Sequence, residues 1–228
     1  MYTGTYRIAG RSISIESQYP DVHAYCAAYR HAGEPDFTIR ITPADIDRER
    51  DKSAREDQRQ GIAPRAFPEG YLEELAVYRQ IADRMPAYDT LLIHGSAIAL
   101  DGAAYLFTAR SGTGKSTHTR FWRQTFGSRA VMINDDKPLV GLTDAGVVIY
   151  GTPYNGKHRL GENLSAPPAG NLHPGTGGGE YHSPHFLRRG VPPAAAAGVP
   201  TRRSGGAGVD LEAVGQAADP GAAVPAGV

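Results

Sequence analysis

The sequence lacks an excess of either charge, has almost no cysteine and contains no long apolar run. Its 24 basic and 24 acidic residues cancel, so we expect no overall attraction to nucleic acid or to an anionic membrane. The single cysteine, Cys26, excludes an internal disulfide and fits a reducing compartment. No stretch approaches about 18 consecutive apolar residues, and the first residues lack the apolar segment of a secretory signal. These absences predict a soluble, cytoplasmic protein.

The last part of the chain lacks what a folded domain needs. Residues 167–228 contain no Ile, Lys, Met, Trp or Cys, although they hold 13 of the 28 glycines and 9 of the 17 prolines. Such a composition cannot bury enough apolar surface to offset the entropy lost when the chain becomes ordered. We therefore expect residues 1–166 to fold and the tail to be unstructured, without a packed core of its own.

Residues 1–60 predict a small N-terminal α+β region. Residues 3–16 alternate apolar and polar side chains on either side of Ala9-Gly10, which indicates two short strands. A short helix is expected over 20–33, followed by another alternating strand over 36–42. Residues 43–59 carry 11 charges, six acidic and five basic, which is typical of a solvated helix or a mobile linker.

Residues 61–166 predict the core of the protein. An amphipathic helix is expected over 68–85, where apolar side chains recur at the helical spacing. The further expected elements are strands over 90–100 and 103–109 joined by Asp101-Gly102, a helix over 116–126 and a strand over 130–134. This order of strand, loop, helix and strand predicts an α/β fold with some antiparallel hairpins.

The segment TARSGTGKSTHT, residues 108–119, carries the strongest functional signal. Small residues let successive backbone N–H groups point at phosphate oxygens, and the helix that follows adds its positive N-terminal end. Lys115 would reach the β- and γ-phosphates of a nucleotide, and the Ser116 hydroxyl would bind Mg²⁺. The expected nucleotide-binding residues are Ser111, Gly112, Thr113, Gly114, Lys115, Ser116 and Thr117. The alternative is a Gly/Ser/Thr turn with an incidental lysine.

The loop departs from the usual pattern at one position. Ala109 stands where G-x-x-x-x-G-K-[ST] has its first glycine. That glycine chiefly eases the exit from the preceding strand, and alanine can serve there if its φ is negative. We therefore expect the loop to be competent despite the substitution.

A P-loop kinase also needs carboxylates at the end of a neighbouring strand. Asp135 and Asp136 follow the apolar strand AVMIN, about 20 residues after Lys115. Of two adjacent carboxylates, one can hold Mg²⁺ and the other can take a proton from a substrate hydroxyl. The alternative is a polar turn after a strand.

A histidine and a cationic loop are further candidates. His94 lies in the apolar run LLIHGSA, where a lone histidine is more often a satisfied core residue than a functional one. The loop over 150–163 could close over a phosphate or an acidic substrate, and a plain surface loop is the alternative. Its candidate substrate residues are Thr152, Gly156, Lys157, His158 and Arg159.

SGTGKST followed by NDD, with LLIHGSAIALDG one hairpin upstream, resembles the catalytic domain of HPr kinase/phosphorylase, and most closely the small HPr-kinase-like proteins. The loop is also similar to that of the phosphoenolpyruvate carboxykinases, which share this P-loop architecture. The resemblance covers roughly residues 88–166. It implies a P-loop domain with a mixed sheet, and Mg²⁺-dependent phosphoryl transfer from ATP or a related donor. It also implies that His94 lies beside a catalytic aspartate and that Asp135 and Asp136 serve as metal partner and base.

Three functions remain open at this point. The first is phosphoryl transfer to a hydroxyl of a protein, peptide or small molecule, with Ser116 and Asp135 as Mg²⁺ ligands. The others are a non-catalytic nucleotide-binding module of a biosynthetic cassette and a plain NTPase. The acidic pair favours an enzyme, whereas an N-terminal region that matches no family we can name favours the module. We expect a nucleotide and a protein or peptide substrate as partners, and neither nucleic acid nor a membrane.

The tail also has a second explanation. If one cytosine is removed from the codons of Pro167-Pro168, permissive codon choices turn residues 166–183 into a strand-like apolar run followed by a turn. The same shift from Gly190 permits an amphipathic helix. A frameshift of this kind removes the C-terminal elements of the domain, and we expect such a chain to be unstable or inactive. Native disorder is the alternative, and the DNA sequence across codons 165–170 separates the two.

Overall fold

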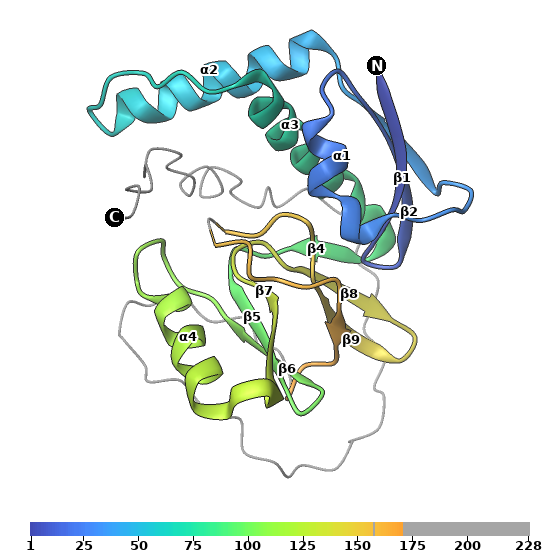
Figure 1. Ribbon diagram of the computed structural model, residues 1–228, viewed down its shortest axis with the longest axis vertical. Coiled ribbons are helices and arrows are strands. Elements are labelled where there is room, and N and C mark those ends of the chain that lie inside the picture. The colour runs from blue at the N-terminus through green and yellow to red at the C-terminus, as the bar shows by residue number, and fades with distance from the viewer. Residues whose placement is uncertain (157, 171–228) are drawn as a thin grey trace, which may run out of the picture.

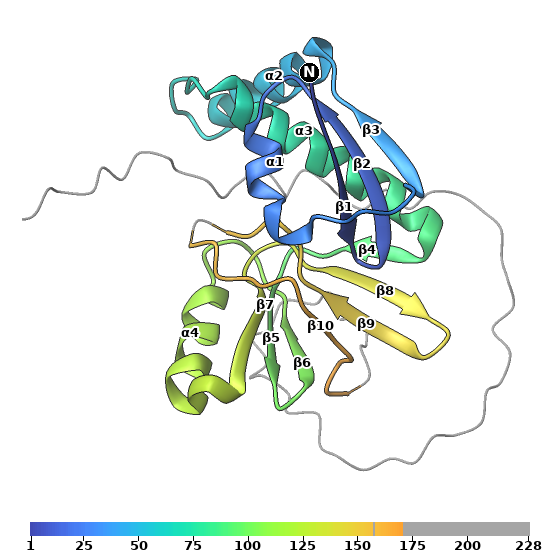
Figure 2. The same ribbon diagram turned by 45° about the vertical axis from the view of Figure 1, so that its right-hand side comes forward.

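The computed structural model describes residues 1–156 and 158–170, which form a mixed α/β structure with three sheets. The N-terminal sheet and three helices lie in the upper half of both views (Figure 1) (Figure 2), and the other two sheets lie below with a further helix. The expectation of an α/β class is confirmed. The boundary predicted for the unstructured tail is wrong by a few residues, because Pro167 and Ala169 exchange backbone hydrogen bonds with Ala104. Beyond residue 170 the predicted tail lies outside the described residues. Within the described part of the chain, no helix is long and apolar enough to cross a membrane.

The chain begins with a hairpin of two antiparallel strands, β1 (Tyr2–Ile8) and β2 (Arg11–Ser17). Ala9 and Gly10 at the turn both have a positive φ, 47° and 78°, as in the two-residue turns that match the twist of the flanking strands. A third strand, β3 (Phe37–Arg40), pairs with β2 in parallel. All three strands were predicted from the alternation of apolar and polar residues, and the structure confirms them.

The helix predicted over 20–33 is wrong in its length. α1 (Asp21–Tyr25) is followed by a single 3₁₀ turn over Ala27–Tyr29. Arg30 then adopts an extended conformation, with φ −55° and ψ 134°, and pairs with Tyr6 of β1. The edge of the N-terminal sheet therefore ends the helical segment, through a contact between distant residues that the local pattern does not encode.

The highly charged segment forms a helix, α2 (Pro43–Arg59), and not a linker. A reciprocal capping box starts it. Its charged side chains are not all solvated, because Glu49 and Asp57 are buried. Glu49 pairs with Arg79, and Asp57 pairs with Arg65 at 2.8 Å. These ion pairs fasten α2 to the helix and the segment that follow it.

α3 (Glu69–Arg84) is the amphipathic helix that the sequence predicted. Its apolar side chains enter a core that they share with the N-terminal sheet and α1, and this core also includes Leu139 and Tyr154 from the second half of the chain. The boundary that we expected at residue 60 falls between α2 and α3, which contact each other. α3 therefore joins the two halves of the structure.

Glu74 on α3 is a half-buried carboxyl whose stability contribution depends on pH. Burial raises its pKa to about 7, with Arg159 lowering it and Asp21 raising it. Because the ordinary value is 4.5, the unfolded chain loses this proton first as the pH rises, and stability falls between these two pKa values. Glu74→Gln is expected to raise the free energy of unfolding near pH 8 by about 1 kcal/mol after solvent screening, and to change it little near pH 3. Urea unfolding at both pH values measures this, and a variant no more stable than the wild type near pH 8 contradicts it.

The second half of the chain forms two sheets in which all neighbouring strands are antiparallel, so the mixed sheet that we expected here is wrong. Their strands are β4 (Thr90–Leu92), β5 (Ser96–Leu100), β6 (Ala103–Phe107), β7 (Ala130–Asn134), β8 (Leu139–Thr143), β9 (Gly146–Tyr150) and β10 (Ser165–Ala166). One sheet has the order β6-β5-β7, and the other has the order β10-β9-β8-β4. Single 3₁₀ turns lie at Met85–Tyr88 and Gly127–Arg129.

The prediction of one strand over 90–100 is wrong, because the chain changes sheets within it. β4 pairs with β8, whereas β5 pairs with β6 and β7. His94 and Gly95 lie in the break between β4 and β5. The apolar pattern could not reveal this break, since it runs through both strands. The hairpin at Asp101-Gly102 is confirmed, with φ 51° and 81° at its two residues.

α4 (Lys115–Phe126) follows β6 across the glycine loop and precedes β7. Trp122 of α4 packs against Tyr105 and Phe107 of β6, with ring centroids 4.7 Å and 5.4 Å apart. The predicted order of strand, loop, helix and strand is thus confirmed. This packing fixes the position of α4, whose first turn carries the candidate lysine.

Candidate functional site

The glycine loop between β6 and α4 is exposed, and its glycines lie where the backbone needs them. Gly112 and Gly114 have φ 80° and 93°, a region that residues with a side chain rarely adopt. Gly114 is also the N-cap of α4. Ala109 is not among the residues with positive φ, so alanine fits where the usual pattern has glycine.

Lys115 begins α4 and folds back over the loop. Its ammonium donates hydrogen bonds to the backbone carbonyls of Ala109 at 2.8 Å and of Arg110 at 3.3 Å. The neighbouring residues of the loop and of the first turn of α4 that carry hydroxyl groups are exposed: Ser111, Thr113, Ser116 and Thr117. Residues 102–134 contain no Asp or Glu, so this part of the chain presents net positive charge and a helix N-terminus to any anion that approaches.

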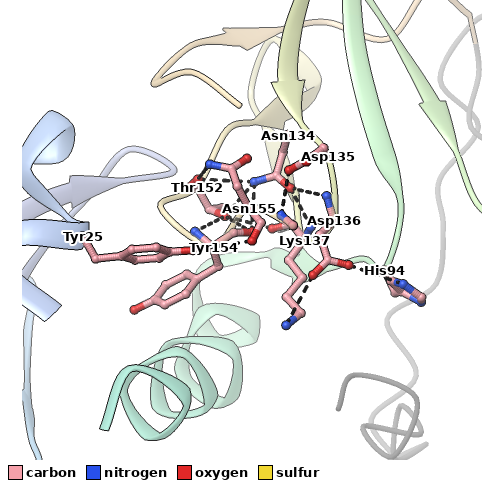
Figure 3. Close-up of polar contacts among 10 residues, drawn as sticks. Tyr25, His94, Asn134, Asp135, Asp136, Lys137, Thr152, Tyr154 and Asn155 are labelled. Atoms are coloured by element: carbon pink, nitrogen blue, oxygen red, sulfur yellow. Dashed lines mark hydrogen bonds and ion pairs between the residues drawn. The ribbon is translucent and has the colours of Figure 1, made fainter. Parts of the chain in front are cut away.

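Asn134 at the end of β7 holds the turn that carries the acidic pair (Figure 3). Its side chain is fully buried, and its amide donates to the Thr152 hydroxyl at 3.0 Å and to the Tyr154 carbonyl at 3.3 Å. Its side-chain oxygen accepts the backbone N–H groups of Asp136 at 2.9 Å and of Lys137 at 2.5 Å. One amide therefore fixes the conformation of the acidic turn and ties it to the loop after β9.

Asn134→Ala is expected to lower the free energy of unfolding by about 2 kcal/mol, because it leaves buried N–H and C=O groups without partners. Urea unfolding measures the change. Asn163→Ala is a matched control, since the exposed Asn163 donates a single hydrogen bond to the Ala28 carbonyl, and we expect it to cost about 0.5 kcal/mol or less. Equal losses in the two variants would show that Asn134 does not hold the turn.

Asp136 lies between a histidine and a lysine. Its Oδ1 atom is 3.5 Å from Nε2 of His94, and its Oδ2 atom is 3.5 Å from Nζ of Lys137 (Figure 3). The backbone N–H of Gly95 donates to the Asp136 carbonyl at 2.9 Å. The break between β4 and β5 therefore brings His94 to the acidic pair.

His94, Lys115 and Asp136 share one electrostatic environment. Burial lowers the pKa of His94, the ammonium groups of Lys115 and Lys137 lower it as well, and Asp136 opposes them. Burial also lowers the pKa of Lys115, and Asp136 opposes this shift too. His94 is therefore a neutral imidazole at pH 7, able to donate or accept one hydrogen bond beside the Asp136 carboxylate.

Asp135 is the neighbouring buried carboxyl. Its Oδ1 atom accepts the backbone N–H of Gly156 at 2.7 Å. Burial raises its pKa, the N–H of Gly156 lowers it, and Asp136 raises it. The described residues contain no group of three or more His, Cys, Asp or Glu side chains that could hold a metal ion. Asp135 and Ser116 could therefore hold Mg²⁺ only together with phosphate oxygens and water, a ligand set that Mg²⁺ commonly uses.

Part of the loop over 150–163 is built into the fold. Thr152 is buried, and its hydroxyl donates to the Lys137 carbonyl at 3.0 Å while it accepts from Asn134. Gly156 contributes its backbone N–H to Asp135. These two candidates thus support the acidic turn from within.

The other candidates of this loop lie towards the solvent. His158 and Arg159 are exposed, and the Arg159 guanidinium lies 4.5 Å from the centre of the Tyr25 ring. Lys157 lies outside the described residues. Of the five candidate substrate residues, His158 and Arg159 are therefore those whose described side chains a ligand could reach.

Sequence reasoning missed two residues of the site, Asn134 and Lys137. Both adjoin the acidic pair in the stretch NDDK. An asparagine at the end of a buried strand must satisfy its amide inside the protein, and this signal could have identified Asn134. Nothing in the local pattern marks Lys137, because the aromatic ring that its ammonium contacts, Tyr78, comes from a distant part of the chain.

Comparison of the sequence with models of known protein families gives no match, and neither does comparison with curated proteins.

Proposed function

We propose that the chain is a Mg²⁺-dependent phosphotransferase with an HPr-kinase-like P-loop domain, which moves the γ-phosphoryl group of ATP to a hydroxyl. The observation that carries the proposal is the 3.5 Å contact between His94 and Asp136, within electrostatic range of Lys115 in the glycine loop. A binding module has no need of a buried carboxylate and a neutral imidazole beside its phosphate loop.

Each group has a role in the proposed reaction. The backbone N–H groups of the glycine loop bind the phosphates, and the Lys115 ammonium moves from the carbonyls of Ala109 and Arg110 to phosphate oxygens. Ser116 and Asp135 would hold Mg²⁺, which would supply positive charge against the phosphates. Asp136 accepts the proton of the attacking hydroxyl, and neutral His94 fixes its Oδ1 atom.

The distribution of charge supports these roles. The stretch from 102 to 134 has no carboxylate, so it attracts phosphate, whereas Asp135 and Asp136 follow it at once and are both buried. A buried carboxylate with a histidine 3.5 Å from one of its oxygens is restricted in direction, as an attacking hydroxyl requires. The acceptor in this proposal is a hydroxyl of a protein, peptide or small molecule.

The purified chain with radiolabelled Mg·ATP and peptides that carry Ser, Thr or Tyr tests the proposal. We expect Mg²⁺-dependent binding of ATP, measured by calorimetry, and transfer of label to a hydroxyl-bearing peptide. Release of inorganic phosphate without transfer would point to an NTPase instead. Binding of ATP with neither transfer nor release would identify a nucleotide-binding module and contradict both enzymatic functions.

A further inference from the structure

Lys137 is a nearly buried lysine that the proposed reaction does not use. Its side chain is 12% exposed, and its ammonium has two neighbours. One is the Oδ2 atom of Asp136 at 3.5 Å, and the other is the ring of Tyr78, whose centre lies 4.7 Å away. The backbone of Lys137 is fixed as well, because its N–H donates to Asn134 and its carbonyl accepts from Thr152.

Tyr78 comes from α3, at the junction of the two halves of the structure. It is 4% exposed, and its ring packs against the Tyr154 ring with centroids 4.7 Å apart. Its hydroxyl is buried and has no hydrogen-bond partner within the described residues. Tyr78 therefore interacts with its neighbours through its ring and not through its hydroxyl. The face of an aromatic ring attracts an ammonium group within about 6 Å.

The two oxygens of Asp136 have different partners as a result. Oδ1 has His94, and Oδ2 has Lys137, whose ammonium also lies over Tyr78. A carboxylate held at both oxygens cannot rotate about its Cβ–Cγ bond without breaking one of the two contacts. Its orientation therefore depends on a residue of the N-terminal half, for which the sequence suggested no role.

We propose that Tyr78 and Lys137 are positioning residues that hold Oδ2 of Asp136, so that Oδ1 faces His94 and the attacking hydroxyl. This inference rests on the proposed phosphotransferase function, in which Asp136 is the base. It makes the N-terminal half part of the active site: α3 supplies the aromatic surface that holds the lysine, and the lysine holds the carboxylate.

The kinetic test measures kcat and the KM for ATP in the turnover of Mg·ATP. It uses two pairs of variants, one at Lys137 and one at Tyr78. Lys137→Met keeps the aliphatic side chain and removes the charge, and we expect kcat to fall about 100-fold because the base is misplaced. The KM for ATP should change by no more than about twofold, because Lys137 does not contact the nucleotide loop. Lys137→Arg keeps the cation and should restore most of the lost kcat. A lysine with a purely structural role would not separate kcat from KM in this way.

The second pair tests the ring. Tyr78→Leu should lower kcat about tenfold through loss of the ring face, and Tyr78→Phe, which keeps the ring, should restore it. The double variant Tyr78→Leu/Lys137→Met should be no slower than Lys137→Met alone, because both changes break the same chain of contacts. Additive losses, or a Phe variant as slow as the Leu variant, overturn the proposal.

A spectroscopic measurement needs no activity and separates this inference from the proposed function. In NMR spectra the ε-methylene protons of Lys137 should be shifted upfield by the ring current of Tyr78 in the wild type and in Tyr78→Phe, and should return to ordinary values in Tyr78→Leu. Ordinary values in the wild type overturn the positioning pair. The upfield shift in a chain that turns over no ATP would confirm the contact and contradict the function on which the inference rests.

Discussion

Lys115→Ala is expected to weaken the binding of Mg·ATP about 1,000-fold, because it removes two charge-assisted hydrogen bonds to phosphate of about 2 kcal/mol each. Among the described residues the ammonium donates its hydrogen bonds to carbonyls of its own loop, so the free energy of unfolding should change little. Isothermal titration calorimetry with ATP and Mg²⁺ measures the affinity.

Arg120→Ala is the matched control for this variant. Arg120 is exposed on the same helix and loses the same charge, but it lies beyond the first turn of α4. We expect its affinity for ATP to stay within about threefold of the wild type, because salt screens the interaction between an exposed charge and a nucleotide at this distance. Equal losses of affinity in the two variants would mean that ATP responds to the overall charge of α4 and not to the loop.

Asp136→Asn is expected to lower the rate of phosphoryl transfer about 1,000-fold, since an amide cannot accept the proton of the attacking hydroxyl. Affinity for ATP should be retained or slightly higher, because a negative charge near Lys115 is removed. Single-turnover transfer of labelled phosphate measures the rate. Asp144→Asn changes an exposed carboxylate in the turn between β8 and β9 and should leave the rate unchanged.

Loss of ATP binding in Asp136→Asn would contradict the assigned role. The variant would then have lost an interaction with the nucleotide, and Asp136 would contribute to the binding of ATP and not to the transfer of the phosphoryl group. A rate equal to that of the wild type would remove Asp136 from the reaction altogether.

The parts of the site that lie in one stretch of sequence could be predicted. The glycine loop needs positive φ at Gly112 and Gly114, and only glycine adopts it readily, so spacing alone located the loop. Asp135 and Asp136 follow a strand whose first four residues form one apolar run in the sequence. Hairpins are similarly local, as Ala9-Gly10 and Asp101-Gly102 illustrate.

The contacts that depend on tertiary packing could not be predicted from composition or periodicity, and only the resemblance placed His94 beside an aspartate. His94 reaches Asp136 because the chain leaves one sheet for another between β4 and β5, and both strands are apolar. Lys137 contacts Tyr78, which lies on α3 and is distant along the chain. The periodicity of the sequence does not indicate the contact between His94 and Asp136 or that between Lys137 and Tyr78, because each residue fits the pattern of its own strand, turn or helix.

The charged helix α2 shows that composition does not reveal buried ion pairs. Composition favoured a solvated segment over 43–59, yet Glu49 and Asp57 are buried against arginines from outside the helix. An ion pair is visible in a sequence only when its partners are three or four residues apart on one helix. Arg79 and Arg65 are too distant along the chain for that signal.

The most direct test of the central claim is a ³¹P NMR time course of the purified chain with Mg·ATP and a peptide that carries a hydroxyl. The account predicts that the γ-phosphate signal of ATP declines while a phosphate ester signal grows, and that Asp136→Asn stops both although it still binds ATP. A γ-phosphate signal that stays constant with the wild-type chain, under conditions where calorimetry shows bound ATP, would contradict the account.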